Sequence, residues 1–192
     1  MKTHLFPAIK LTLLSLLFFV VMYGAVVWGV ALVLAPNHGG GALVLKDGYV
    51  VGFASVGQRF TKDYYFWSRP SAVNYNAAGS GGSNKGPSDP AYLRTVQARL
   101  DTFLLHNPGV VRVRVPMELI TASGSGLDPD ISPEAARVQV PRIAKARSMA
   151  TEKIYQLVSD HIQEPWLGVL GPRVVNVLML NIELDKLENE KK

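Results

Sequence analysis

Residues 11–34 read LTLLSLLFFVVMYGAVVWGVALVL, and this stretch decides how the chain is organised. No charged residue occurs between Lys10 on one side and Lys46 on the other. As an α-helix the stretch would be about 36 Å long, enough to cross a bilayer core of about 30 Å with some tilt. About fifteen of its residues are Leu, Phe or Val, which favours insertion by several kcal/mol. We therefore predict one transmembrane helix over residues 11–34.

The alternative to an anchor is a cleaved signal peptide. The hydrophobic region of a signal peptide usually has about 7–15 residues, and this run is much longer. A small-residue cleavage site is available at Ala35, but Pro36 follows it and should hinder processing. We therefore expect a retained anchor. Ala25 and Gly29 lie four residues apart within it, a spacing that lets a partner helix approach closely.

The orientation of the anchor follows from its flanking charges. Lys2 and Lys10 precede it, whereas the first basic residue after it is Lys46. The positive-inside rule then predicts a cytoplasmic segment 1–10, a transmembrane helix 11–34 and an extracytoplasmic domain 35–192. In a bacterium this would be the inner membrane, with the domain in the periplasm.

Composition limits the classes of protein to consider. The net charge is +5, and in the domain the basic residues are scattered among acidic ones, which does not indicate nucleic-acid binding. The chain has no cysteine, so disulfides and Cys-based zinc sites are excluded. Its four histidines are far apart in the sequence, so we predict no metal site.

Residues after the anchor predict both strands and helices. Asp47-Gly48 separates two β-prone runs, 42–46 and 49–53, as in a hairpin with a type I′ turn. Asp89 can cap a helix that begins at Pro90 and ends before Asn107-Pro108. One face of that helix is apolar and should be buried: Leu93, Val96, Leu100, Phe103 and Leu104.

The second half of the domain continues this mixture. The alternation in 110–115, VVRVRV, predicts a strand with Val111, Val113 and Val115 facing the core. Ser132 should cap a helix that kinks or breaks near Pro141. Thr151 can cap a further helix, and 173–180 is typical of a strand, followed by a short polar tail. The fold class is therefore α+β, a mixed α/β domain tethered by one N-terminal transmembrane helix.

Residues 64–75, YYFWSRPSAVNY, are rich in aromatic side chains. One interpretation is a core segment and its edge, with Arg69 covered by ring faces. The other is a docking surface, because Tyr, Trp and Arg anchor interfaces.

Two Gly/Ser-rich loops are the candidate functional segments. Loop A spans 77–89 and loop B spans 121–133. Backbone N–H groups of such loops can cradle phosphate. Loop A lacks the spacing of a Walker A loop, and only its centre matches the ABC-transporter signature. We therefore favour rigid surface loops that pack on a partner. The candidate residues are Ser80, Gly81, Gly82, Ser83 and Asn84 in loop A and Ser123, Gly124, Ser125, Gly126 and Asp128 in loop B.

Loop B also allows two chemical alternatives. A serine hydrolase using Ser123 or Ser125 would need a base, and no His or Lys lies near them in the sequence. Calcium binding by Asp128 and Asp130 would lack the other ligands of a known calcium loop. A turn at Asp128-Pro129 is the interpretation we favour, and no catalytic residue is predicted.

Eight short segments, spread in order along nearly the whole chain, form one recognisable set of motifs. They are Gly57-Gln58-x-Phe60, 65–72 (YFWSRPSA), 80–88 (SGGSNKGPS), 121–129 (TASGSGLDP), 131–133 (ISP), 139–142 (QVPR), 176–178 (NVL) and 180–181 (LN). Together they resemble one family, the C subunit of the Kdp potassium-transporting ATPase, and the run SGSGLDP in loop B makes the resemblance specific. Glu118, where the family usually has Asp, and an apparent extra residue in 174–176 are the departures.

The resemblance implies an accessory, non-catalytic subunit of an ATP-driven potassium uptake complex. Its partners would be an ATP-hydrolysing P-type subunit, a channel-like potassium-conducting subunit and a small membrane peptide subunit. The family's C subunit is described as raising the ATP affinity of the hydrolysing subunit, so ATP and potassium would be handled by the complex.

Two questions stay open at this stage. The predicted orientation puts both loops outside the cell whereas ATP is inside, so we favour an indirect effect on nucleotide binding. The rival functions are a freestanding anchored periplasmic serine hydrolase and an anchored protein that binds a small ligand.

Overall fold

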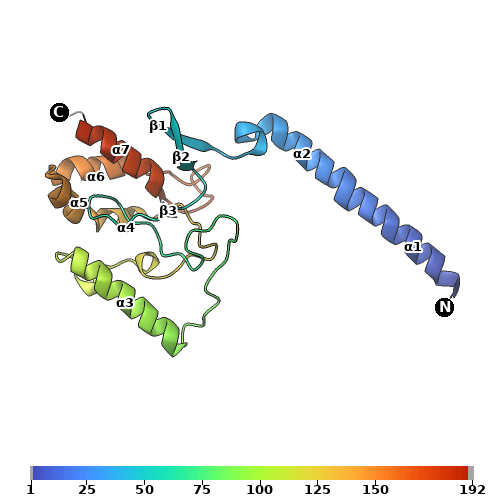
Figure 1. Cartoon of the computed structure of the whole chain (residues 1–192), viewed down its shortest axis with the longest axis horizontal. Coiled ribbons are helices and arrows are strands. Elements are labelled where there is room, and N and C mark those ends of the chain that lie inside the picture. Colours follow the sequence, from blue (N-terminus) through green and yellow to red (C-terminus); the bar gives the residue numbers. More distant parts are fainter. Residues whose placement is uncertain (1, 190–192) are drawn as a thin grey trace. The chain divides into compact units, whose positions relative to one another are not determined.

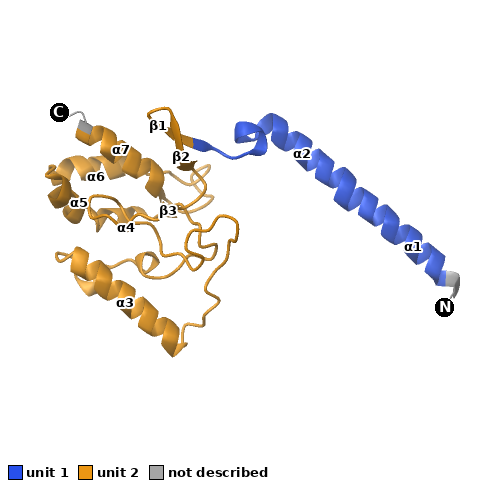
Figure 2. Ribbon diagram, viewed as in Figure 1, with its two compact units in different colours: residues 1–43 blue, residues 44–192 orange. Residues whose placement is uncertain are grey.

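The computed structural model describes residues 2–189 and divides the chain into two compact units, Met1–Leu43 and Val44–Lys192 (Figure 2). The first unit is one continuous helical rod (Figure 1). It consists of α1 (Lys2–Leu16), a π-helical segment η1 (Leu17–Met22) and α2 (Tyr23–Leu34), and a short turn η2 (Pro36–Gly39) follows. Within it, His4–Leu34 is long and apolar enough to cross a membrane. The helix thus starts earlier than the sequence pattern predicts.

The second unit mixes helices with two small sheets, which confirms the α+β prediction. The hairpin of β1 (Leu43–Lys46) and β2 (Tyr49–Phe53) turns at Asp47 and Gly48, whose φ angles are 52° and 81°. The second sheet pairs β3 (Asp130–Ile131) with β4 (Val175–Asn176) in antiparallel register, with Ile131 opposite Val175.

The helices begin and end largely where local signals predict. The Asp89 carboxylate accepts from two backbone N–H groups at the start of α3 (Pro90–His106), and Ser132 caps α4 (Pro133–Arg137). A break before Pro141 separates α4 from α5 (Val140–Arg147). The predicted cap at Thr151 is wrong, because Thr151 is already inside α6 (Thr151–Asp160) and its N-cap is Ala150. Leu93, expected in the core, is exposed.

Helices α4, α5, α6 and α7 (Val177–Asn189) gather on one side of the unit, and α3 lies along the other (Figure 1). The core between them is apolar, and it accounts for the compactness of the unit. Its fully buried side chains include Phe66, Ile143, Ile154, Leu180 and Leu184.

An irregular segment runs through the centre of this core. Phe66 is fully buried, and its backbone N–H and C=O pair with the side-chain amide of Asn181 at 2.8 and 3.0 Å. The N–H of Trp67 donates to the buried amide oxygen of Gln139 at 2.8 Å. These amides replace the hydrogen bonds that a regular element would supply, because buried backbone groups need partners. The core interpretation of this segment is correct for Phe66.

The strand predicted over residues 110–115 is wrong. Residues 112–114 form a 3₁₀ turn, η3 (Arg112–Arg114), closed by an Arg114 N–H to Val111 carbonyl bond of 2.9 Å. Val113 is 91% exposed, so only Val115 of the alternating valines is buried. An alternating pattern makes a strand only where a partner strand supplies hydrogen bonds, and here local turn bonds take their place.

The C-terminal segment is also different from the prediction. Only β4 is extended, and the Asn176 side chain then accepts from the Met179 N–H at 3.1 Å, which caps α7. Helix α7 continues through the expected polar tail and buries Leu184. An asparagine N-cap inside an apolar run therefore overrides its strand-like composition.

Candidate functional site

The structure brings the two Gly/Ser loops together. The backbone N–H of Gly81 donates to the Ser125 carbonyl oxygen at 2.8 Å, and the Ser80 hydroxyl donates to the same oxygen at 3.0 Å. Ser83, Asn84, Gly124 and Ser125 remain exposed around this junction. We call the exposed part of the two loops, Ser80, Ser83, Asn84, Gly124 and Ser125, the Gly/Ser surface.

Glycine allows close packing at two positions of the junction, and its absence of a Cβ matters most at Gly126. A Cβ atom on Gly126, whose φ is +68°, would lie 2.6 Å from a methyl carbon of Val73 and 2.8 Å from the Gly81 carbonyl oxygen. A Cβ on Gly82 would lie 3.0 Å from the carbonyl oxygen of Gly124. Gly124 itself faces open space. The loops thus use two glycines to pack on one another, and Gly124 is left free for another surface.

The serine hydroxyls of loop B hold turns. The buried Ser123 hydroxyl accepts from the Gly126 N–H at 2.9 Å, and the Ser125 hydroxyl accepts from the Leu127 N–H at 3.1 Å. Within residues 2–189, His106 pairs with Asp63 and the His161 ring with a backbone carbonyl, not with either serine. This arrangement offers no activated nucleophile, so it does not favour a hydrolase.

Asp128 anchors loop B to the aromatic segment. Its carboxylate pairs with Arg69 at 2.7 Å and accepts from the Asp130 N–H at 3.1 Å. The neighbouring residue also holds loop B in place, since the Leu127 carbonyl accepts a hydrogen bond from the Gly57 N–H at 2.7 Å. Among the described residues no ring face lies over the Arg69 guanidinium, which pairs with Asp128 instead. Asp128 thus acts in a turn and an ion pair.

Ring faces of this segment instead lie against three other arginines. The guanidinium of Arg59 lies 5.9 Å from the centre of the Tyr75 ring. The guanidinium of Arg142 lies 4.6 Å from the centre of the Trp67 ring, and that of Arg147 lies 5.1 Å from the Tyr65 ring. Contacts of this kind are favourable because the face of an aromatic ring attracts a cation. Sequence spacing alone did not show that Arg142 and Arg147 would meet the rings, because both are far from this segment along the chain.

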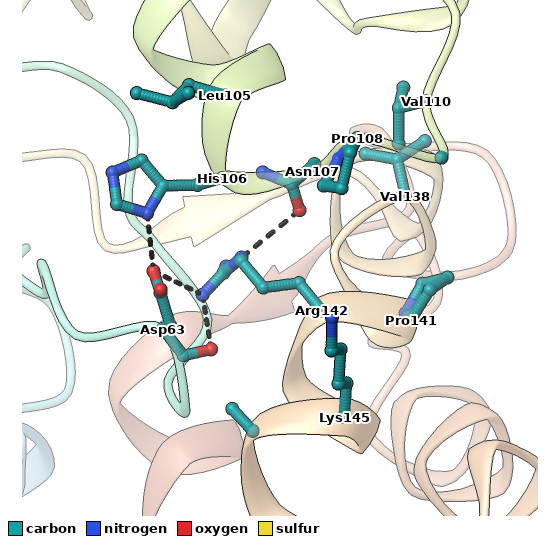
Figure 3. A pocket seen from close by; sticks show the side chains of 12 residues that line it. Asp63, Leu105, His106, Asn107, Pro108, Val110, Val138, Pro141, Arg142 and Lys145 are labelled. Atoms are coloured by element: carbon teal, nitrogen blue, oxygen red, sulfur yellow. Dashed lines mark hydrogen bonds and ion pairs between the residues drawn. The ribbon is translucent and has the colours of Figure 1, made fainter.

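A separate cavity of about 570 Å³ lies between the end of α3 and the start of α5 (Figure 3). Figure 3 shows His106 and Arg142 directed toward Asp63; the His106 to Asp63 distance is 2.7 Å. The cavity wall is largely apolar. Lys145 is one of the lining residues, and it is exposed to solvent. The lining residues are Asp63, Leu105, His106, Asn107, Pro108, Gly109, Val110, Val138, Pro141, Arg142, Lys145 and Ala146.

Arg142 is a structural part of this cavity. Its side chain donates to the Asn107 amide oxygen at 3.1 Å, the Tyr65 carbonyl at 3.1 Å and the Gln139 amide oxygen at 2.8 Å. Burial lowers its pKa to about 10, while nearby Asp63 acts in the opposite direction. The guanidinium therefore stays charged at neutral pH. We did not predict this cavity from the sequence. The sequence feature that could have pointed to it is the QVPR run at 139–142, which carries both Gln139 and Arg142.

In the anchor, the predicted packing residues lie on α2. A Cβ on Gly29 would meet no atom within 4 Å, and Ala25 is exposed. The structure thus leaves this face open, and its role in helix packing stays a prediction.

Taken together, these observations define a class of protein: an α+β domain joined to one helix that is able to span a membrane. The chain also matches a protein-family model, KdpC (K⁺-transporting ATPase, c chain), over residues 5–186. It belongs to this family, which confirms the resemblance drawn from its motifs.

Individual relatives agree with the family match over almost their full length. The chain is 51% identical over 191 residues to the potassium-transporting ATPase KdpC subunit of Bacteroides fragilis, covering 98% of this chain and 100% of the relative. The KdpC subunit of Bacteroides thetaiotaomicron is 49% identical, with 97% and 99% covered. That of Polaromonas naphthalenivorans is 46% identical, with 98% and 97% covered.

Proposed function

We propose that this chain is a non-catalytic accessory subunit of an ATP-driven potassium uptake complex. The observation that carries the proposal is the family match over residues 5–186, which includes both the anchor and the domain. The chain contains no Asp-Lys-Thr-Gly phosphorylation motif and no Walker A loop, so ATP hydrolysis belongs to another subunit.

The proposed partners are the ATP-hydrolysing P-type subunit, the channel-like subunit that conducts potassium and a small membrane peptide subunit. The anchor lies in the bacterial inner membrane with its N-terminus in the cytoplasm, as the flanking lysines predict. The open face at Ala25 and Gly29 suits close packing against a partner helix.

The Gly/Ser surface is the proposed contact of the domain with a partner. It is rigid, because loop-to-loop and turn hydrogen bonds hold it, and a rigid surface loses little conformational entropy on binding. In this proposal the subunit raises the ATP affinity of the hydrolysing subunit indirectly, by stabilising the assembled complex. The nucleotide itself stays on the cytoplasmic side.

Purification from membranes in a mild detergent tests this function. We expect the tagged chain to co-purify with a P-type ATPase subunit and a potassium-conducting subunit, identified by mass spectrometry. Complexes that lack this chain should show a raised KM for ATP in potassium-stimulated hydrolysis. Recovery of the chain without these subunits, or an unchanged KM in its absence, would contradict the proposal.

A further inference from the structure

The connection between α6 and β4 carries an apolar tip. Four large side chains on it are directed to solvent: Trp166 is 69% exposed, Leu167 74%, Val169 78% and Leu170 55%. A protein normally buries such a group of neighbours, and a contiguous exposed apolar patch marks an interaction site. We call residues 165–172 the apolar tip.

The apolar tip has a defined shape. The Trp166 N–H donates to the Leu170 carbonyl at 2.9 Å, and the Gly168 N–H donates to the Pro165 carbonyl at 2.8 Å. Below them, Gln163 and Val174 exchange backbone hydrogen bonds of 2.8 and 3.2 Å. The tip is therefore a small closed turn on a paired stem, which presents its side chains outward.

Charge is absent from the tip and present at its base. Residues 165–172 contain no Asp, Glu, Lys or Arg, whereas Glu164 and Arg173 form an ion pair across the stem. A neutral apolar tip above an ion pair matches the change from hydrocarbon to headgroup at a membrane surface. Tryptophan is enriched at that boundary because its ring is apolar and its N–H is polar.

We propose that the apolar tip inserts into the surface of the lipid bilayer and is a second membrane contact of this chain. The bilayer is always close to the domain, because a short linker joins the domain to the anchor. Residues 35–42 join α2 to β1 and span at most about 28 Å when fully extended. A unit of this size has a radius of gyration of about 15 Å, so the domain stays beside the bilayer that holds the anchor.

Site-directed spin labelling tests the insertion with the full chain reconstituted in lipid vesicles. The chain has no native cysteine, so Leu167→Cys and Val169→Cys each give one labelling site. Val113→Cys is the matched control, because Val113 is an exposed apolar residue on a different element. Power saturation compares the access of oxygen, which concentrates in lipid, with that of a water-soluble nickel complex.

We expect labels at 167 and 169 to be several-fold more accessible to oxygen than to nickel, and the label at 113 to show the reverse. Replacing Trp166 and Leu170 with Ser in the Leu167→Cys chain should shift that label toward nickel access. Nickel access at 167 and 169 equal to that at 113 would overturn the proposal. Exclusion of both reagents in the complex with partner subunits would also overturn it, since protein would then cover the tip. The vesicle measurement needs no partner, so its failure leaves the proposed subunit role standing.

Discussion

The backbone N–H of Gly81 donates to the carbonyl oxygen of Ser125 over 2.8 Å, and this bond makes two distant loops into one surface. The Ser80 hydroxyl reaches the same oxygen, so loop A is held at two points by one residue of loop B. A substitution in either loop should therefore alter the conformation of the other.

Substitution of Gly126 tests this junction. Gly126→Ala should lower the free energy of unfolding by about 2 kcal/mol, because the new Cβ combines a positive φ with contacts below 3 Å. Chemical denaturation of the full chain in detergent measures the change. Gly124→Ala is the control and should cost less than about 0.5 kcal/mol, since Gly124 faces open space. Equal losses for both variants would show that loop packing is not the cause.

Gly124 is also the better probe of the proposed partner contact. Gly124→Val should leave the domain folded and lower potassium-stimulated ATPase activity of the complex several-fold. The added side chain would push the Gly/Ser surface away from the partner subunit. The assay is ATP hydrolysis by purified complexes with and without potassium. Full activity with normal complex recovery would show that the Gly/Ser surface does not touch a partner at this position.

The anchor gives a prediction about helix packing. Gly29→Leu should weaken co-purification with the partner subunits and leave membrane insertion intact, because the larger side chain closes the small-residue face. Gly24→Leu is the matched control, since at about 100° per residue it lies on a different face of α2. Quantitative mass spectrometry of the recovered complexes measures the effect. Equal recovery of both variants and the unmodified chain would contradict the packing role.

The ion network at Asp185 makes a prediction for stability. Its carboxylate binds Lys46 at 2.6 Å, Arg147 at 2.6 Å and the Tyr65 hydroxyl at 2.9 Å. Asp185→Asn should lower the free energy of unfolding by about 3 kcal/mol, because the Arg147 side chain is only 3% exposed and loses the less exposed of its two carboxylate partners. Glu188→Gln, at the exposed side of the same arginine, should cost less than about 1 kcal/mol. Similar values for both would argue against a special role of the Asp185 carboxylate in this network.

The same carboxylate sets a pH dependence. Burial acts to raise its pKa, but hydrogen bonds from Lys46, Arg147 and Tyr65 outweigh burial and hold the pKa of Asp185 below its usual range. The unfolded chain therefore takes up this proton first as the pH falls. The stability advantage over Asp185→Asn should be constant above about pH 5 and shrink below about pH 4. Urea unfolding at a series of pH values measures it, and an advantage that grows on acidification would contradict the assignment.

Orientation of the anchor can be measured directly. A reporter enzyme that is active only outside the cytoplasm, fused after Lys192, should be active, because Lys2 and Lys10 hold the N-terminus inside. A cytoplasm-dependent reporter at the same position is the control and should be silent. The reverse pattern, with both fusions stably expressed, would overturn the proposed topology.

Nucleotide binding by the chain alone separates a direct from an indirect effect on ATP affinity. We expect no saturable binding of ATP at submillimolar concentration to the purified chain, because the Gly/Ser surface is proposed to lie outside the cell. Isothermal titration calorimetry makes the measurement. Saturable binding that Gly124→Val abolishes would show that the loops contact nucleotide and that the packing proposal is wrong.

Local signals predicted the fold well where one residue acts on its own neighbours. Asp89 and Ser132 cap helices by accepting from N–H groups two or three residues later, and Asp47-Gly48 turns the hairpin through positive φ angles. Such interactions depend on short segments, so they can be predicted from the order of residues. Thr151 shows the limit, because a possible cap was not the one used.

Patterns failed where the partner was distant. Residues 110–115 alternate like a strand but have turn bonds in place of a partner strand, and Asn176 begins a helix inside an apolar run. The cavity beside Arg142 was missed for the same reason, since Asp63, His106 and Arg142 come from three separate segments.

The membrane-spanning helix, the α+β class and the family could all be predicted from the order of residues, because apolar length, local caps and collinear motifs do not depend on long-range packing. The three-dimensional fold was needed to show that loop A packs on loop B through Gly82 and Gly126, and that Gln139 and Asn181 hold the buried segment around Phe66. These contacts join residues far apart in the chain. Their geometry arises only when burial of the common core brings the segments together and each buried polar group must find a partner.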